Sequence, residues 1–271
     1  MHMRVAAAAF AAVAAITMMA SLAAAQPSPA TSDSAPLAGG TLTLSAGIDY
    51  STGKYGDVTS TDILYLPVAA KYEIDKWILK LTVPFIRVTG PGNVVRDVGV
   101  VAGRAAGPRR TEAGLGDIIL GVTRNVYDGA ASGTLVDLTG KIKFGTASFD
   151  KGLGTGETDF SPQVDLTQRV TPVITAFGSF GYKFVGNPAG VDLHNVFYGE
   201  GGGSYKFTSA SSAGLILFLS EVESSSGPQR ELTAFVNQRL AERWKLLGYV
   251  VHGFANGSPD WGGGAVVSYR F

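Results

Sequence analysis

The 271-residue chain contains no cysteine, which excludes disulfide bridges and the thiolate ligands of a structural zinc site. Charged residues are scarce as well: they make up 16% of the chain, against about 25% in typical soluble domains, and the formal net charge is +0. This balance provides no basic surface for nucleic acid. With only 3 histidines, the chain also has little material for a metal site, and we expect no metal and no cofactor.

Long apolar runs are missing beyond residue 40, where we find neither a transmembrane helix nor a convincing amphipathic helix. Residues 1–25 differ, because they combine Arg4, an alanine-rich apolar stretch and three alanines at 23–25. This order predicts a signal peptide cleaved after Ala25, hence export; a retained membrane anchor is the alternative. Residues 26–40 are rich in Pro, Ser, Ala and Thr, which predicts a flexible segment in the periplasm or in a barrel lumen.

The chain is rich in glycine, with 36 residues, and from residue 41 its apolar and polar side chains alternate with a period of two. Residues 213–219 and 244–254 are apolar on both faces, so their register cannot be read. Arg124 interrupts the apolar face of another segment, which indicates an irregular register there. We predict about twelve strands, at residues 41–50, 64–72, 77–85, 118–126, 136–144, 160–170, 174–184, 197–207, 213–219, 232–240, 244–254 and 261–271.

The connections between these strands alternate strictly in length. Short ones fall at residues 74–76, 128–132, 171–172, 208–210 and 241–243. Longer, glycine-rich ones fall at residues 51–60, 89–113, 146–158, 186–195, 223–229 and 255–260. Alternation of this kind, with aromatic residues near both strand ends, is typical of an outer-membrane barrel and not of a soluble Greek-key sandwich. The sequence therefore predicts an all-β, antiparallel up-and-down transmembrane β-barrel over residues 41–271.

The last strand has the features of a closing strand. Ala265, Val267, Tyr269 and Phe271 share one face, and the chain ends on the aromatic residue. Because hydrocarbon cannot satisfy a free sheet edge, we expect this strand to pair antiparallel with residues 41–50. Tyr269 and Phe271 would then face lipid at the periplasmic rim and act as the signal read by the barrel-assembly machinery.

Charged residues of the strands fall on the face opposite to the apolar one. A charge facing lipid near mid-membrane costs a few kcal/mol, so these side chains are expected to point inward. They either pair across the lumen and fill it or line a solute path through a narrow, partly plugged channel. The candidate lumen-lining residues are Asp49, Lys71, Lys80, Asp117, Asp137, Lys141, Lys143, Asp165, Arg169, Lys183, Glu200, Glu231, Arg239 and Arg270.

The long connection at residues 89–113 carries four arginines, which either contact lipopolysaccharide phosphates, fold inward as a constriction, or lie in solvent: Arg96, Arg104, Arg109 and Arg110. Two pairings suggest rim catalysis of the lipase or protease kind, His252 with Ser268 and Asp192 with His194. Sequence alone does not place their side chains within reach of one another, and we expect no enzyme.

Several short motifs resemble the outer-membrane family named after the meta-pathway of phenol degradation. They are residues 114–117 (GLGD), 141–146 (KIKFGT), 152–160 (GLGTGETDF), 253–260 (GFANGSPD) and 269–271 (YRF). Where relatives often have a Pro-Thr-Gly step after the fifth strand, this chain has Phe144, Gly145 and Thr146. Family members are generally described as transporters of small, often aromatic, compounds.

The resemblance implies a passive channel for small, hydrophobic or aromatic molecules in the outer membrane of a Gram-negative bacterium. Its partners would be membrane lipid, lipopolysaccharide, the barrel-assembly machinery and the solute. The main alternative is a structural or adhesive surface barrel whose lumen is closed.

Overall fold

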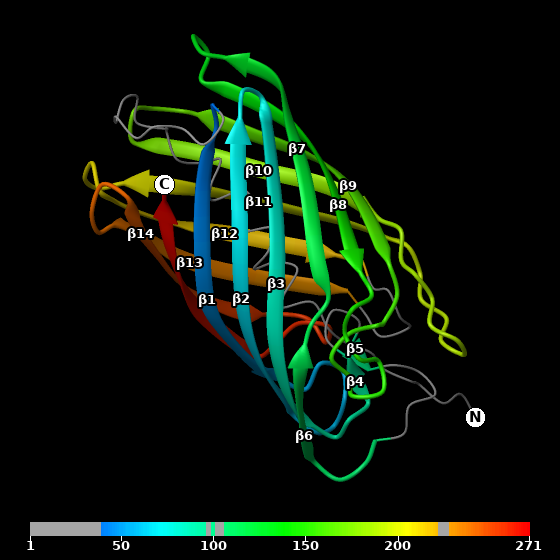
Figure 1. Cartoon of the computed structure of the whole chain (residues 1–271). Coiled ribbons are helices and arrows are strands. Elements are labelled where there is room, and N and C mark those ends of the chain that lie inside the picture. The colour runs from blue at the N-terminus through cyan, green and yellow to red at the C-terminus, as the bar shows by residue number, and fades with distance from the viewer. Residues whose placement is uncertain (1–38, 96–98, 101–105, 222–227) are drawn as a thin grey trace.

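The computed structural model describes residues 39–95, 99–100, 106–221 and 228–271, and Figure 1 shows these residues as one large, strongly curved sheet. Within these residues, no helix is long and apolar enough to cross a membrane. The strands are β1 (Thr41–Gly53), β2 (Thr61–Ile74), β3 (Trp77–Gly90), β4 (Val94–Val95), β5 (Gly99–Val100), β6 (Arg110–Leu115), β7 (Ile118–Gly129), β8 (Thr134–Phe144), β9 (Asp159–Arg169), β10 (Ile174–Lys183), β11 (Val196–Lys206), β12 (Ser211–Ser220), β13 (Gln229–Arg239), β14 (Trp244–Gly253) and β15 (Trp261–Arg270).

The main sheet closes on itself as an antiparallel barrel. It contains 13 strands, of which β6 is a short addition, so 13 − 1 = 12 strands form the ring. Each strand of the ring pairs with its neighbours in chain order, and β1 pairs with both β2 and β15. Closure removes the free edges that hydrocarbon could not satisfy. The predicted up-and-down barrel is therefore confirmed, and all twelve predicted strands are present.

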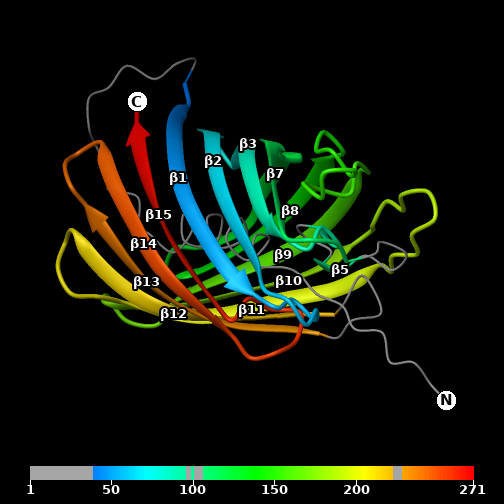
Figure 2. The same ribbon diagram turned by 90° about the horizontal axis from the view of Figure 1, so that it is seen from below.

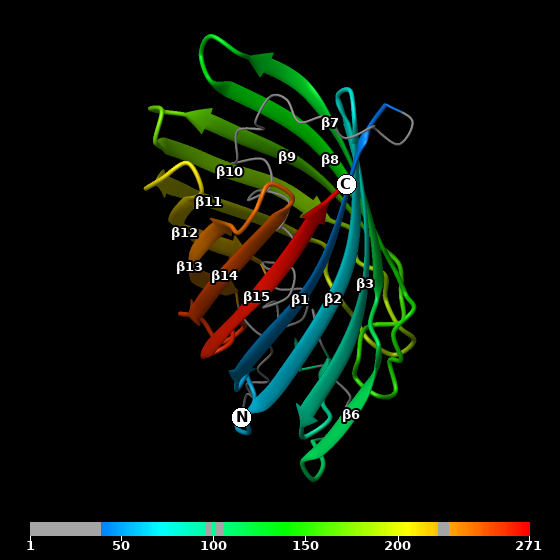
Figure 3. The ribbon, with the colours of Figure 1, turned by 60° about the vertical axis from the view of Figure 1, so that its left-hand side comes forward.

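The closing contact lies where the terminal strand meets the first one. Leu44 is opposite Tyr269, and the Phe271 N–H donates a hydrogen bond to the Leu42 carbonyl at 2.9 Å. Figures 2 and 3 show β15 running beside β1 along their length. The Tyr269 ring packs edge-on against Trp244 and Phe271, with centroids 4.9 and 4.8 Å away. The predicted antiparallel pairing of the chain's last strand with its first is confirmed.

The segment at residues 89–113, expected to be a loop, is partly sheet. Strand β3 pairs with β7 through residues 77–82, and farther out it pairs with β6 through residues 85–90. Strand β6 extends beyond the other strands of the barrel (Figure 3). The two partners of β3 are separated at Gly116, whose N–H donates to the Pro84 carbonyl at 2.9 Å. A Cβ at Gly116 would lie 2.5 Å from Ile86 Cδ1 and 2.9 Å from Pro84 Cγ, so a side chain at this position would have to displace both. Arg96 and Arg104 lie outside the described residues.

The two ambiguous strands acquire a definite register in the barrel. In β12, Ile216 and Phe218 are buried inside while Leu215, Leu217 and Leu219 are exposed on the outer face. In β14, Leu247, Tyr249 and Val251 are buried inside and Val250 is exposed. Both strands are apolar on each face because the lumen as well as the lipid side is apolar at this part of the ring.

The irregularity indicated by Arg124 is also real. The register of β7 against β8 shifts between Asn125 and Tyr127, as it does at a β-bulge. The bulge lies near the short-turn end of the strand. Arg124 remains on the outer face, where its guanidinium lies 4.7 Å from the centre of the Trp77 ring, a cation–π contact.

Candidate functional site: the inner surface of the barrel

One side of the inner surface is apolar. Seven buried side chains from β10 and β12–β15 form a continuous cluster, which we call the apolar wall: Phe177, Ile216, Phe235, Leu247, Tyr249, Val251 and Val266. Phe177 and Phe235 have ring centroids 6.4 Å apart, so adjacent parts of the wall are in aromatic contact. This wall offers an apolar surface inside the barrel, away from the lipid.

The aromatic rings of this wall lie on glycines of the neighbouring strands. Phe177 is directly opposite Gly202, Phe235 is opposite Gly214, and Tyr249 is opposite Gly264. A Cβ built on these glycines would come within 3.0, 2.6 and 2.7 Å of the facing ring. The absence of a side chain therefore lets each ring lie along the wall, as in aromatic coverage of strand glycines.

Tyr249 connects the apolar wall to the first strand. Its ring crosses Gly264 and its hydroxyl donates a hydrogen bond to Asp49 Oδ2 at 2.7 Å. Asp49 is itself 4% exposed, so this bond is shielded from bulk water. Glycine at 264 thus makes possible a contact between β14 and β1 that spans β15.

Another part of the inner surface, on β7–β9 with Tyr198 of β11, is a polar wall joined by hydrogen bonds. Lys141 Nζ donates to Gln163 Oε1 at 2.6 Å, and the Tyr198 hydroxyl donates to the same oxygen at 3.0 Å. Gln163 in turn donates to Asp165, whose other oxygen accepts from Thr139 Oγ1 at 2.7 Å. Each of these five side chains therefore has a hydrogen-bonding partner, which offsets the cost of removing it from water.

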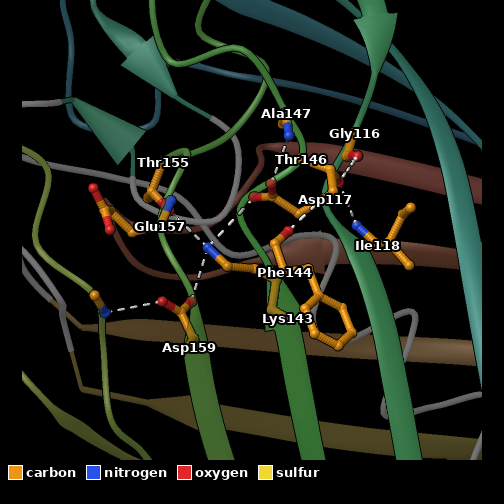
Figure 4. A network of polar contacts seen from close by, with 11 residues as sticks. Gly116, Asp117, Ile118, Lys143, Phe144, Thr146, Ala147, Thr155, Glu157 and Asp159 are labelled. Carbon is orange, nitrogen blue, oxygen red and sulfur yellow. Dashed lines mark hydrogen bonds and ion pairs between the residues drawn. The ribbon is translucent and has the colours of Figure 1, made fainter.

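A buried ion cluster lies at one end of the polar wall (Figure 4). This is the end of the barrel that carries the long connections, which we call the outer end. Lys143 Nζ lies 2.9 Å from Asp159 Oδ2 and 3.4 Å from Asp117 Oδ2, and it donates to Thr155 Oγ1 at 2.7 Å. The exposed side-chain fractions of the three charged residues are 10%, 3% and 5%. One lysine thus joins two carboxylates and the connection between β8 and β9.

The same cluster fixes the backbone of that connection. The Ala147 N–H donates to Asp117 Oδ1 at 2.8 Å. The cluster also holds the connection between β10 and β11, where the Gly186 N–H donates to Asp159 Oδ1 at 3.0 Å. Thr146 Oγ1 donates to the Gly116 carbonyl and accepts from the Ile118 N–H, both at 2.9 Å (Figure 4). Residues 145–158 are therefore held against the barrel by charge and backbone together.

Loop residues also pack together at the outer end. An apolar cluster combines strand residues of β2 and β3 with residues from three connections: Tyr55, Ile63, Tyr65, Ile86, Val88, Val94, Ala147 and Leu153. Leu153 is 2% exposed and Val94 is 1% exposed, so these connections are not simply solvated. Within residues 89–113, Val94 packs in this cluster, and whether the segment forms a constriction stays a prediction. Arg109 instead pairs with Asp62 and is exposed, as is Arg110.

Every predicted lumen residue lies on the inner side of the backbone alternation or, for Asp117, beside it at the start of β7. The structure brings Asp117 together with Lys143, and Lys141 with the Asp165 network. Asp49, Glu200 and Glu231 are buried farther round the ring, and Asp137 accepts from Asn125 Nδ2 at 2.8 Å. Arg239 donates to the Ser209 carbonyl at 3.1 Å at the short-turn end. Whether these residues line a solute path stays a prediction.

The catalytic pairing of His252 with Ser268 is wrong. His252 is opposite Trp261, whereas Ser268 is opposite Lys245, near the other end of the same strand pair. Ser268 hydrogen-bonds Ser45 at 2.8 Å, and His252 Nδ1 contacts the Asp260 carbonyl at 2.8 Å. Asp192 and His194 are both exposed, in the connection between β10 and β11. Within the described residues, no group of three or more potential metal ligands is present.

The apolar wall was missed by the sequence analysis, which assigned all apolar alternation to the lipid side. Two features of the sequence indicate the wall: two strands that are apolar on both faces, and inward glycines that lie opposite aromatic residues. The pairing partner of each strand was needed to recognise it.

Comparison with known proteins gives the family. Residues 75–271 match the family described as "Putative MetA-pathway of phenol degradation". The chain belongs to this family. No curated protein matches the sequence significantly.

Two solved structures are similar in fold to this chain. The COG4313 outer membrane channel from Pseudomonas putida F1 is 13% identical, with a TM-score of 0.65, and the match covers 91% of this chain and 100% of that chain. The translocator domain of the autotransporter NalP from Neisseria meningitidis is 12% identical, with a TM-score of 0.51, covering 96% and 95%. The shared feature is the architecture of an outer-membrane β-barrel.

Proposed function

We propose that the protein is a passive outer-membrane channel for small hydrophobic or aromatic molecules. The observation that carries this proposal is the apolar wall: seven buried apolar side chains line the inside of a closed barrel, beside a wall of hydrogen-bonded polar groups. These aromatic rings cover inward glycines and give one side of the lumen an apolar character that could bind the apolar part of a solute. Family membership supports the same function.

The candidate path runs between the apolar and polar walls. The charged groups predicted to face the lumen would keep the path hydrated, while the aromatic wall would bind the apolar part of a solute. We propose the predicted lumen residues as the polar side of this path. No catalytic step is part of the proposed function.

The test is transport by the purified protein. In liposome swelling and in planar bilayers, the folded barrel should pass small solutes and ions, whereas the heat-denatured protein should pass neither. A protein that folds, as judged by circular dichroism and by its heat-modifiable migration, yet gives neither swelling nor conductance would contradict the proposal.

The packed outer-end cluster favours a second candidate, a structural or adhesive surface barrel with a closed lumen. In that case the inward contacts of residues such as Leu153 and Val94 would serve to seal the barrel. The same bilayer recording separates the two functions, because a sealed barrel gives no steady conductance.

We further propose that residues 1–25 are removed on export, that residues 26–40 form a lead-in to the barrel, and that the barrel-assembly machinery reads Tyr269 and Phe271. In this proposal, membrane lipid contacts the exposed apolar face, and the exposed Arg109 and Arg110 bind lipopolysaccharide phosphates. Deleting Phe271 should reduce the amount of folded barrel in the outer membrane. Phe207→Ala is the matched control, since Phe207 is an exposed aromatic residue near a short turn. Equal assembly of the two variants would remove the signal role.

A further inference from the structure

A row of cationic side chains crosses the inner surface from strand to strand. Arg270 is opposite Thr43, Thr43 is opposite Lys71, and Lys71 is opposite Lys80. On the other side of β3, Lys80 is opposite Gly121, which is opposite Lys141. These positions all point inward, and the row contains four cations and no carboxylate at any paired position, as read from the register: Arg270, Lys71, Lys80 and Lys141.

The two lysines at the centre of this row, Lys71 and Lys80, repel each other unless an anion is bound between them. Lys71 and Lys80 are directly cross-strand, an arrangement in which like charges destabilise a sheet. The sheet nevertheless keeps both lysines side by side.

The flanking cations have partners that Lys80 lacks. Lys71 pairs with Glu73 at 2.9 Å, and Lys141 Nζ donates to Gln163 Oε1 at 2.6 Å. Among the residues that the structure describes, no carboxylate forms an ion pair with Lys80. Next to it, Gly121 leaves the surface unfilled, because a Cβ there would meet only the Lys80 carbonyl oxygen, at 3.9 Å.

We propose that Lys80, flanked by Lys71 and Lys141, is an anion-binding site inside the barrel that selects small monovalent carboxylates for passage. A carboxylate there supplies the missing counter-charge and accepts hydrogen bonds from the ammonium groups. Its apolar part can rest on the surface that Gly121 leaves open. This inference rests on the proposed channel function and adds to it the charge of the preferred solute.

The first experiment measures ion selectivity in planar bilayers under a potassium chloride gradient. The reversal potential of the wild-type channel should show preference for chloride. Lys80→Gln should reduce the chloride-to-potassium permeability ratio by at least about twofold, since a charge in a narrow lumen strongly biases local ion concentration. Lys80→Glu should reverse the preference. Lys76→Gln, an exposed residue in the turn between β2 and β3, should leave the ratio unchanged.

The second experiment uses benzoate as the probe. Benzoate should reduce the chloride current of the wild-type channel in a concentration-dependent way, and Lys80→Gln should weaken this block while Lys76→Gln should not. Unfolding in urea serves as the check on folding: removing one of two facing like charges should not lower the stability of Lys80→Gln. A merely structural role for Lys80 would lower it.

The outcomes separate this inference from the channel proposal. Absence of conductance in the folded wild type would overturn the channel function and, with it, the anion site. Conductance with cation preference, or with a selectivity and benzoate block that Lys80→Gln leaves unchanged, would overturn the anion site and leave the channel function standing.

Discussion

The apolar and polar walls of the barrel connect neighbouring strands through different kinds of side-chain contact. The polar wall joins neighbouring strands by side-chain hydrogen bonds, as in the contacts of Lys141, Gln163 and Asp165. The apolar wall joins them by laying aromatic rings over glycines, as Phe235 does over Gly214. The first depends on complete hydrogen-bonding partners and the second on missing side chains. The free energy of unfolding should therefore respond differently to substitutions in the two walls.

The largest effect is expected at the charged end of the polar wall. Lys143→Ala would leave Asp117 and Asp159 buried together without their shared cation, which should destabilise the barrel by about 3–5 kcal/mol. Urea unfolding in detergent or lipid vesicles measures this. Lys151→Ala, on an exposed residue of the same connection, is the control. Equal stability of the two variants would show that the cluster does not hold the polar wall.

A smaller effect is expected from filling a glycine of the apolar wall. In Gly264→Ala, the added methyl group would meet the Tyr249 hydroxyl at 2.6 Å and the Ile48 carbonyl at 2.5 Å, costing about 2 kcal/mol as overpacking does. The displaced ring should also reduce single-channel conductance. Gly248→Ala is the matched control, because a Cβ there meets nothing within 4 Å. If stability and conductance were unchanged in both Gly264→Ala and Gly248→Ala, the Tyr249 ring would not depend on the missing side chain at Gly264.

The smallest effect is expected where the apolar wall makes its polar contact. Tyr249→Phe keeps the ring over Gly264 but removes the 2.7 Å hydrogen bond to Asp49, and the loss should be about 1.5 kcal/mol. Conductance should stay close to that of the wild type, unlike that of Gly264→Ala. Tyr205→Phe, on the exposed outer face, provides the reference for losing a hydroxyl alone. A loss equal to that reference would mean that the Asp49 bond contributes nothing.

The barrel was predictable because its outer face obeys a simple rule. Lipid requires apolar side chains at every second position, so strands such as β3 and β8 could be placed from their alternation, and the closing pair from the lack of tolerable edges. The inward direction of Lys80 or Asp165 follows from the same rule. The alternation of short and long connections then indicated the up-and-down order of the strands.

The two walls could not be predicted because they depend on the lumen, where both polar and apolar side chains are acceptable. The inward positions of Ile216 and Tyr249 could not be told from outward ones, because their strands are apolar on both faces. The Lys143 cluster needed a register that places Asp117 and Asp159 on either side of β8. Strand β6 was missed because residues 110–115 show no apolar alternation.

The most direct test of the two-wall channel is a comparison of two solutes in liposome swelling. The folded barrel should pass L-phenylalanine faster than glucose, because the aromatic ring can follow the apolar wall while the charged groups follow the polar wall. Phe235→Ser, which removes a central ring of that wall, should abolish the difference. Swelling by neither solute, or equal rates in the wild type and in Phe235→Ser, would contradict the account.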